Sequence, residues 1–161
     1  RFQRKKSSES TRMMVNKSVV ILFGTESGNA EFAAEDMAAE VLDRPVEVID
    51  MSDFDVNSFS HENLYLIICS THGEGDLPSG AMPLHEALES VNPDLTGIQY
   101  AMFGLGDSSY ENYSKGSEHI DRKLSALGAT RVGEYGRHDA DTGTLPSALA
   151  VKWAKAILGA N

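Results

Sequence analysis

The chain alternates between short apolar runs and longer stretches in which apolar residues recur every three or four positions. Short apolar runs are typical of strands that a parallel sheet buries on both faces, and the longer period is typical of amphipathic helices. The expected strands are residues 18–23, 46–49, 64–70, 98–105 and 130–134. The expected helices are residues 29–43, 81–90, 114–127 and 145–158. Residues 51–62 are expected to form an acidic, irregular connection that has room for a helical turn.

Strands that alternate with helices predict an α/β fold: a doubly wound, five-stranded parallel sheet with helices on both faces. Five strands suit the order 2-1-3-4-5 and also half of a dinucleotide-binding fold. In the first helix, Ala33, Met37 and Val41 share one face, which we expect to pack on the sheet. The Asn-Pro pair at 92–93 predicts the end of the second helix, and Gly128 predicts the end of the third.

Three glycine-rich loops follow the first, third and fourth expected strands, and we call them the first, second and third loop. They are residues 24–30, 70–78 and 104–110. The carboxyl ends of parallel strands meet at one edge of the sheet, which is where such folds bind ligands. We therefore expect the three loops to surround a single site.

The first loop joins a strand to the start of a helix, so that free backbone N–H groups and the positive helix end point to one place. Thr25 and Ser27 add hydroxyl donors, and Gly28 lets the backbone approach a ligand closely. The loop holds no Lys or Arg and no Gly-x-Gly-x-x-Gly pattern, which excludes a P-loop and a dinucleotide fingerprint. A cradle of neutral donors suits a phosphate monoester that is bound but not transferred. An ordinary helix cap by Ser27 or Asn29 explains the loop equally well.

The second and third loops carry groups suited to a flat, polar ring. Gly73 and Gly75 leave backbone groups of the second loop exposed, and a peptide that turns over there can present either a carbonyl or an N–H. His72 either covers a ring face or is a solvent-exposed loop residue. Tyr110 either stacks on an aromatic ligand or packs on the next helix. Scattered carboxylates around one His lack the spacing of a metal site. Together the three loops predict a pocket for FMN, with its phosphate, ribityl chain and redox-active ring.

Composition and charge narrow the class of protein further. The length of 161 residues suggests one domain, and the single cysteine, Cys69, lies in an apolar run where we expect it to be buried. Of the net charge of −10, residues 1–18 carry +5, which leaves −15 for the other 143 residues. An acidic body argues against nucleic-acid binding and favours a protein partner with a basic surface.

The first 17 residues are polar, basic and rich in Ser, and we interpret them as a disordered tail or linker before a domain over 18–161. A juxtamembrane segment on the cytoplasmic side is the alternative interpretation. No apolar stretch is long enough to span a membrane, and no signal-peptide core is present. Because the chain starts at Arg1 rather than Met, we expect it to be part of a longer protein. We expect a cytoplasmic monomer, tethered to the membrane at most by a segment upstream of Arg1.

At the three loops the sequence resembles the flavodoxin family, over residues 18–158. The stretches 24–31, 70–78 and 103–110 are similar to the FMN domains of diflavin reductases of the sulfite reductase flavoprotein type. In having a histidine at position 72, the second stretch resembles the small MioC-like flavodoxins. Many other members of the family have an aromatic residue or Gln at this position. The resemblance implies the flavodoxin-like strand order 2-1-3-4-5, without the insertion of long-chain flavodoxins.

The resemblance also implies non-covalently bound FMN and assigns the residues around it. The phosphate loop comprises Thr25, Glu26, Ser27, Gly28, Asn29 and Ala30. One side of the ring is bordered by Thr71, His72, Gly73 and Gly75, and the other by Gly104, Gly106, Asp107 and Tyr110. Ser70, Asn112 and Tyr113 are further residues expected to bind the cofactor. Asp139 and Asp141 correspond to acidic residues beyond the fifth strand. Gly73 is the peptide expected to turn over, and Tyr110 is the side chain expected to stack. Neither a metal ligand nor a catalytic side chain is implied.

We therefore predict an FMN-dependent electron-transfer domain that shuttles electrons between a reductase, or a fused reductase module, and an acceptor protein. The expected partners are basic-surfaced redox proteins: an NADPH- or ferredoxin-dependent flavin reductase, and a haem or other acceptor. Two alternatives stay open. One is an NAD(P)H-dependent FMN or quinone oxidoreductase, which the absence of a dinucleotide fingerprint disfavours. The other is an interaction module without FMN, which the intact Thr25, Ser27 and Tyr110 disfavour.

Overall fold

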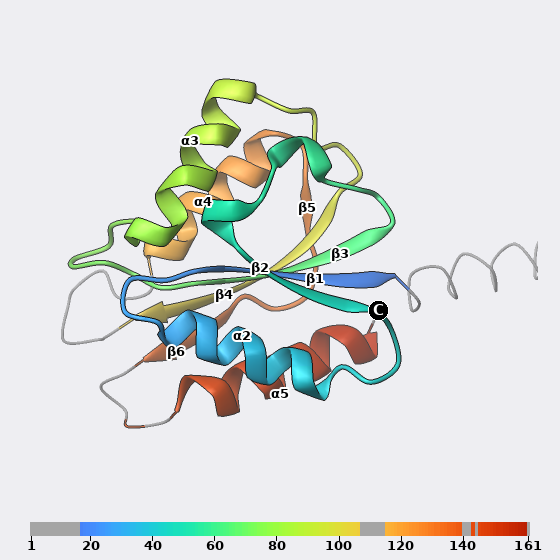
Figure 1. Ribbon diagram of the computed structural model, residues 1–161, viewed down its shortest axis with the longest axis vertical. Helices are drawn as coiled ribbons and strands as arrows, with labels where there is room; N and C mark the ends of the chain where they lie inside the picture. The colour runs from blue at the N-terminus through green and yellow to red at the C-terminus, as the bar shows by residue number, and fades with distance from the viewer. Residues whose placement is uncertain (1–16, 107–114, 140–142, 144, 161) are drawn as a thin grey trace, which may run out of the picture.

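The computed structural model describes residues 17–106, 115–139, 143 and 145–160 (Figure 1). The predicted tail lies outside the described residues except for Lys17. The Lys17 ammonium donates a hydrogen bond to Gln99 Oε1 at 3.0 Å, so this residue contacts the start of the sheet.

The sheet is parallel throughout and has the predicted order β2-β1-β3-β4-β5, with β6 also pairing with β4. Its strands are β1 (Ser18–Gly24), β2 (Val46–Asp50), β3 (Asn63–Cys69), β4 (Gln99–Gly106), β5 (Thr130–Arg131) and β6 (Gly136–Asp139). In β1, Val19, Ile21 and Phe23 pack on one face, while Val20 and Leu22 pack on the other. All five are buried, as expected of a strand covered on both faces.

The fifth position of the sheet differs from the prediction of one continuous strand over 130–134. β5 pairs with the start of β4 and β6 pairs with its end, while residues 133–135 leave the ladder after a last bond from the Val132 N–H to the Tyr100 carbonyl at 2.7 Å. Gly133 has a φ of +72°, which a strand does not adopt, and the indole N–H of Trp153 donates to the carbonyl of Glu134 at 2.9 Å. These two features interrupt the strand, and pairing with β4 resumes at Gly136.

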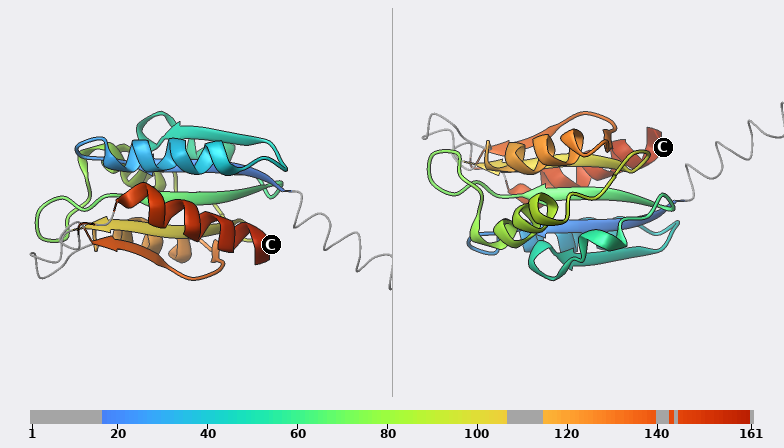
Figure 2. Two further views of the ribbon diagram at one scale, coloured as in Figure 1. Left: turned by 90° about the horizontal axis from the view of Figure 1, so that it is seen from below. Right: turned by 90° about the horizontal axis from the view of Figure 1, so that it is seen from above.

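Helices cover both faces of the sheet, as predicted. They are α2 (Asn29–Glu40), α3 (Met82–Val91), α4 (Gly116–Ala126) and α5 (Pro146–Ala160). α2 and α5 pack side by side on one face, and α3 and α4 lie on the other (Figure 2). Ala33 and Met37 are buried, which confirms the expected face of the first helix for these two residues, whereas Val41 is buried but lies beyond the end of α2. Cys69 is also buried, and burial raises the pKa of its thiol to about 12.

The helix ends follow local backbone signals. α3 ends where Asn92 takes a φ of +52°, and Gly128 follows α4 with a φ of +103°. α2 ends at Glu40, three residues earlier than predicted, because Val41 is already extended. Three single 3-10 turns complete the described elements: η1 (Met51–Asp53), η2 (Val56–Ser58) and η3 (Ser79–Ala81). The irregular connection after β2 thus holds two helical turns, where the sequence suggests one.

Candidate functional site

The first and second loops meet at the carboxyl edge of the sheet, where β1 and β3 are neighbours. The helices that follow these two strands lie on opposite faces, so this is the switch point at which doubly wound folds bind ligands. Ser70 N–H donates to the Gly24 carbonyl at 2.9 Å, and Gly80 N–H donates to the Thr25 carbonyl at 3.1 Å. A Cβ at Gly80 would lie 2.7 Å from that carbonyl oxygen, so the two backbones touch. The loops therefore form one continuous surface.

The first loop presents a row of free amides. Gly28 has a φ of +96° and is the N-cap of α2, so neither Ser27 nor Asn29 caps the helix by its side chain, and this alternative was wrong. The Gly28 N–H instead donates to Thr25 Oγ1 at 2.7 Å. Among the described residues, no hydrogen bond is made by the amides of Asn29, Ala30 and Glu31. These donors and the positive helix end fit a phosphate, since they offer neutral hydrogen bonds in one place.

The second loop folds back as a hairpin of residues 72–76. The N–H and carbonyl groups of His72 and Asp76 pair reciprocally, at 2.8 and 2.9 Å. Gly73 and Gly75 have φ values of +54° and +119°, which glycine adopts with little strain, so both glycines suit the turn. Within the described part of the chain, the Gly73 and Glu74 peptides have no hydrogen-bond partner. The hairpin therefore leaves its tip free for a ligand, which fits the edge of a polar ring.

The His72 side chain is 58% exposed, and its Nδ1 lies 3.7 Å from Glu26 Oε1. Its contact with a ring face stays a prediction. The Glu26 carboxylate accepts the Ser79 N–H at 2.6 Å, and this bond, with a smaller contribution from the charge of His72, lowers the pKa of Glu26. Glu26 thus contacts the segment after the second loop, although the resemblance counted it with the phosphate loop.

Helix α4 contributes two contacts to the second loop that the sequence did not predict. The Gly116 N–H donates to Thr71 Oγ1 at 3.0 Å, and His119 Nε2 lies 2.9 Å from the carbonyl oxygen of Gly75. A Cβ at Gly116 would lie 2.5 Å from the carbonyl oxygen of Asp76, so the helix rests directly on the hairpin. No local pattern marks Gly116 or His119, because their partners lie 45 and 44 residues away.

The third loop is described only where it leaves the sheet. Gly104 and Gly106 are residues of β4 itself, because the strand continues to Gly106, one residue beyond its predicted end. Gly106 is the register partner of Asp139 in β6, which brings this predicted acidic residue to the same edge. The other predicted residues of this side, namely Asp107, Tyr110, Asn112, Tyr113 and Asp141, lie outside the described residues.

Other features of the described residues lie apart from this edge. A cavity of about 540 Å³ lies between α5 and residues 133–137, and its walls include Phe103, Tyr135 and Trp153 but none of the predicted site residues. In the described ranges, no three His, Cys, Asp or Glu side chains gather as metal ligands would. Across the same ranges, no helix combines the length and apolar character that crossing a membrane requires.

The strand order defines a doubly wound α/β domain, with the neutral amide cradle and the glycine hairpin together at the carboxyl edge of its sheet. The chain belongs to the flavodoxin family, whose sequence model matches residues 21–153. It is thus an FMN-binding electron-transfer domain, which confirms the predicted fold, cofactor and class of function.

Solved structures and curated relatives agree with this assignment. A cysteine-to-serine mutant of flavodoxin from Pseudomonas aeruginosa is 27% identical with a TM-score of 0.77, and the match covers 89% of this chain and 97% of that one. Oxidised flavodoxin 1 from Bacillus cereus is 30% identical with a TM-score of 0.64, covering 84% and 97%.

Longer proteins also match. The sulfite reductase [NADPH] flavoprotein alpha-component of Vibrio parahaemolyticus is 38% identical over 144 residues, which are 88% of this chain and 22% of the relative. The component of the same name from Bacillus subtilis is 37% identical over 130 residues, covering 78% and 21%. The chain therefore spans about a fifth of the length of these relatives.

Proposed function

We propose that this domain carries electrons from a flavin reductase module to an acceptor protein with a basic surface. The observation that carries the proposal is the pair of adjoining loops: among the described residues, one has unpaired amides and the other has unpaired Gly73 and Glu74 peptides at the hairpin tip. The relatives named sulfite reductase [NADPH] flavoprotein are several times longer than the matched region, which supports a reductase module on the same polypeptide. The acceptor would be a haem or other redox protein, and the domain itself would work as a monomer.

The first loop would hold the FMN phosphate. The amides of Asn29, Ala30 and Glu31 would donate to the phosphate oxygens, and the positive end of α2 would stabilise their charge. Thr25 Oγ1 accepts from Gly28, which leaves the Thr25 hydroxyl hydrogen free to donate to the same group. Because no cation belongs to this loop, the phosphate would be bound without being activated for transfer.

The hairpin tip would meet the edge of the flavin ring. When bound, FMN supplies the one- and two-electron redox chemistry. We expect the Gly73 peptide to turn over, which is supported by the conformational freedom of glycine and by the open space around its Cα, where an added Cβ would meet nothing within 4 Å. Its carbonyl would accept a hydrogen bond from the protonated ring nitrogen of the reduced flavin. Its N–H would donate a hydrogen bond to the same nitrogen of the oxidised flavin, which carries no hydrogen. Gly104, Gly106 and the predicted residues after them would form the opposite wall.

The charge of the domain would select its partner. Glu26 and Glu74 lie on the two loops with Asp76, and the body of the chain carries a net −15 outside its first 18 residues. Like-charged carboxylates near the ring disfavour adding electrons, which lowers the reduction potential of the flavin. The same carboxylates attract a basic partner surface, so that the association rate should fall as salt is added.

The proposal is tested by titrating the chain, freed of flavin, with FMN and following the quenching of flavin fluorescence. We expect saturable binding of one FMN per chain and a yellow complex. Rapid mixing of the complex with NADPH should leave its colour unchanged until a flavin reductase is added. Bleaching by NADPH alone would instead indicate a self-sufficient oxidoreductase, and no saturable binding would contradict the proposal outright.

A further inference from the structure

The histidine of α4 makes two contacts that indicate which of its ring nitrogens donates. His119 Nε2 lies 2.9 Å from the Gly75 carbonyl oxygen, and its Nδ1 lies 3.1 Å from Nη2 of Arg122. Arginine can only donate, so Nδ1 accepts, and a carbonyl can only accept, so Nε2 carries the hydrogen. Only the neutral ring with its hydrogen on Nε2 satisfies both contacts. His119 therefore donates a hydrogen bond to the second loop.

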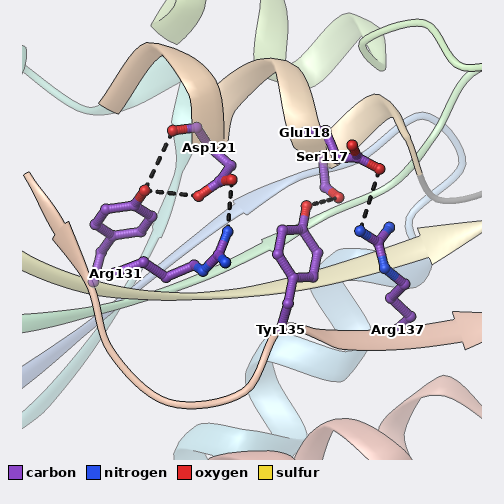
Figure 3. Close-up of polar contacts among 7 residues, drawn as sticks. Ser117, Glu118, Asp121, Arg131, Tyr135 and Arg137 are labelled. Carbon is purple, nitrogen blue, oxygen red and sulfur yellow. Dashed lines mark hydrogen bonds and ion pairs between the residues drawn. The ribbon is translucent and has the colours of Figure 1, made fainter. Parts of the chain in front are cut away.

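Helix α4 is itself fixed to the edge of the sheet on another of its sides (Figure 3). Three residues of α4 form this side: Ser117, Glu118 and Asp121. Their partners lie in β4, in β5, in β6 and in the residue before β6. Asp121 accepts from the Tyr100 hydroxyl at 2.7 Å and pairs with Arg131 at 2.7 Å. Glu118 pairs with Arg137 at 3.2 Å, and the hydroxyl groups of Ser117 and Tyr135 are hydrogen-bonded to each other. His119 thus reaches the hairpin from a rigid element.

The hairpin needs such support because little else holds its tip. His72 and Asp76 close its base, but the three residues between them include two glycines, which lose much conformational entropy when they are ordered. Among the described residues, the bond from His119 to Gly75 is the one hydrogen bond that joins the tip to another element. It turns the Gly75 carbonyl towards α4, and this leaves the Gly73 and Glu74 peptides as the groups that can face a ligand.

We propose that His119 is a positioning residue of the FMN site: it anchors the hairpin at Gly75 so that the Gly73 peptide alone turns over. The proposal rests on the proposed FMN site. It predicts that loosening the anchor weakens FMN binding and changes the reduction potential, although His119 acts through Gly75 and not on the ring. The reduced flavin should lose more binding affinity than the oxidised flavin. This is because the Gly73 carbonyl would accept a hydrogen bond from the ring N–H that forms on reduction.

The test compares His119→Leu and His119→Gln with a matched control, His61→Leu. His61 makes the same kind of contact, from Nε2 to the Thr96 carbonyl at 2.9 Å, but at the opposite end of the sheet. For each variant we would measure the dissociation constant of FMN, the midpoint potential of bound FMN, and amide hydrogen exchange of Asp76 without FMN. His119→Leu should weaken FMN binding about fivefold, as expected for one hydrogen bond, lower the potential, and speed the exchange of Asp76.

His119→Gln should restore most of the three values, because its amide nitrogen can donate to the same carbonyl. His61→Leu should leave them unchanged, although it removes an equivalent bond. Equal values for His119→Leu and the unsubstituted chain would overturn the proposal, and so would equal effects of His119→Leu and His61→Leu. If the unsubstituted chain binds no FMN, the proposed function fails, and Asp76 exchange still decides whether His119 anchors the hairpin.

Discussion

The first and second loops lie side by side at one edge of the sheet, but they are held in different ways. In the first loop, the Thr25 hydroxyl accepts from an amide only three residues away, and the loop continues directly into α2. In the second loop, Thr71 and Gly75 are held by residues of α4 that lie 45 and 44 positions further along the chain. The amides of the phosphate cradle are thus ordered by a bond within their own loop, although Gly24 and Thr25 also bond to the second loop and to Gly80. The ring-facing hairpin closes on itself at His72 and Asp76 and depends in addition on the packing of a distant helix. Changes in α4 should therefore act selectively on the hairpin.

The largest effect is expected from Gly116→Ala, which disturbs the packing of α4 against the second loop. The new methyl group would lie 2.5 Å from the Asp76 carbonyl oxygen and 2.7 Å from Thr71 Cα, and backbone atoms cannot move aside singly. We expect a loss of about 2–3 kcal/mol in the free energy of unfolding, measured by urea denaturation, together with weaker FMN binding. Gly159→Ala is the control, since nothing lies within 4 Å of its added methyl group. Equal stabilities of the two variants would show that α4 does not rest on the hairpin.

Gly28→Ala tests the local organisation of the first loop. Its Cβ would meet no atom closer than 3.8 Å, so the cost comes from the φ of +96° alone. We expect a loss of about 1–2 kcal/mol in the free energy of unfolding. FMN affinity should also fall, because the amides of α2 would shift. Gly28→Asn should lose less, since Asn adopts a positive φ more readily than Ala. Equal losses in the free energy of unfolding for Gly28→Asn and Gly28→Ala would show that the positive φ of Gly28 is not the cause.

Thr25→Ala removes the short-range bond of the first loop. The Gly28 N–H loses its acceptor at 2.7 Å, and we expect the free energy of unfolding to drop by about 1 kcal/mol. Thr25→Ser keeps the hydroxyl and should stay close to the unsubstituted chain. Thermal unfolding of both variants is measured with and without FMN. The values without FMN report the loss of the bond within the loop, and the additional difference with FMN reports the loss of a donor to the phosphate. A Ser variant as weak as the Ala variant would exclude the hydroxyl as the cause.

The contrast between the loops also explains which features the sequence could predict. β1 and β3 were located to within a residue because each is an apolar run buried on both faces. The glycines of both loops were recognisable as turn residues, but the cap of α2 was not, because Gly28 replaces the side-chain caps expected of Ser27 or Asn29. The fifth strand was predicted as one continuous strand, but it is divided into β5 and β6, and a hydrogen bond from Trp153 of α5 helps to interrupt it. Contacts between distant segments leave no local pattern, so the supports from α4 were missed.

The smallest effect concerns Glu26, which links the first loop to Ser79, the residue that directly follows the second loop. The Ser79 N–H, bonded to the carboxylate at 2.6 Å, lowers the pKa of Glu26, with a smaller contribution from His72. A lowered pKa means that the charged form is favoured in the folded chain. Its stabilisation is therefore complete well above pH 4.5, and it is lost as the pH falls below that value through the lowered pKa.

Glu26→Gln should cost less than about 0.5 kcal/mol at pH 7, because the carboxylate is exposed to solvent. The difference from the unsubstituted chain should shrink as the pH falls below 4.5, where Glu26 itself becomes neutral. Glu26→Ala removes the acceptor altogether, so that its deficit should persist at low pH. Urea denaturation of the three chains between about pH 3 and 7 measures these differences. A Gln deficit that stays constant over this range would show that the strength of the Ser79 bond does not depend on the charge of Glu26.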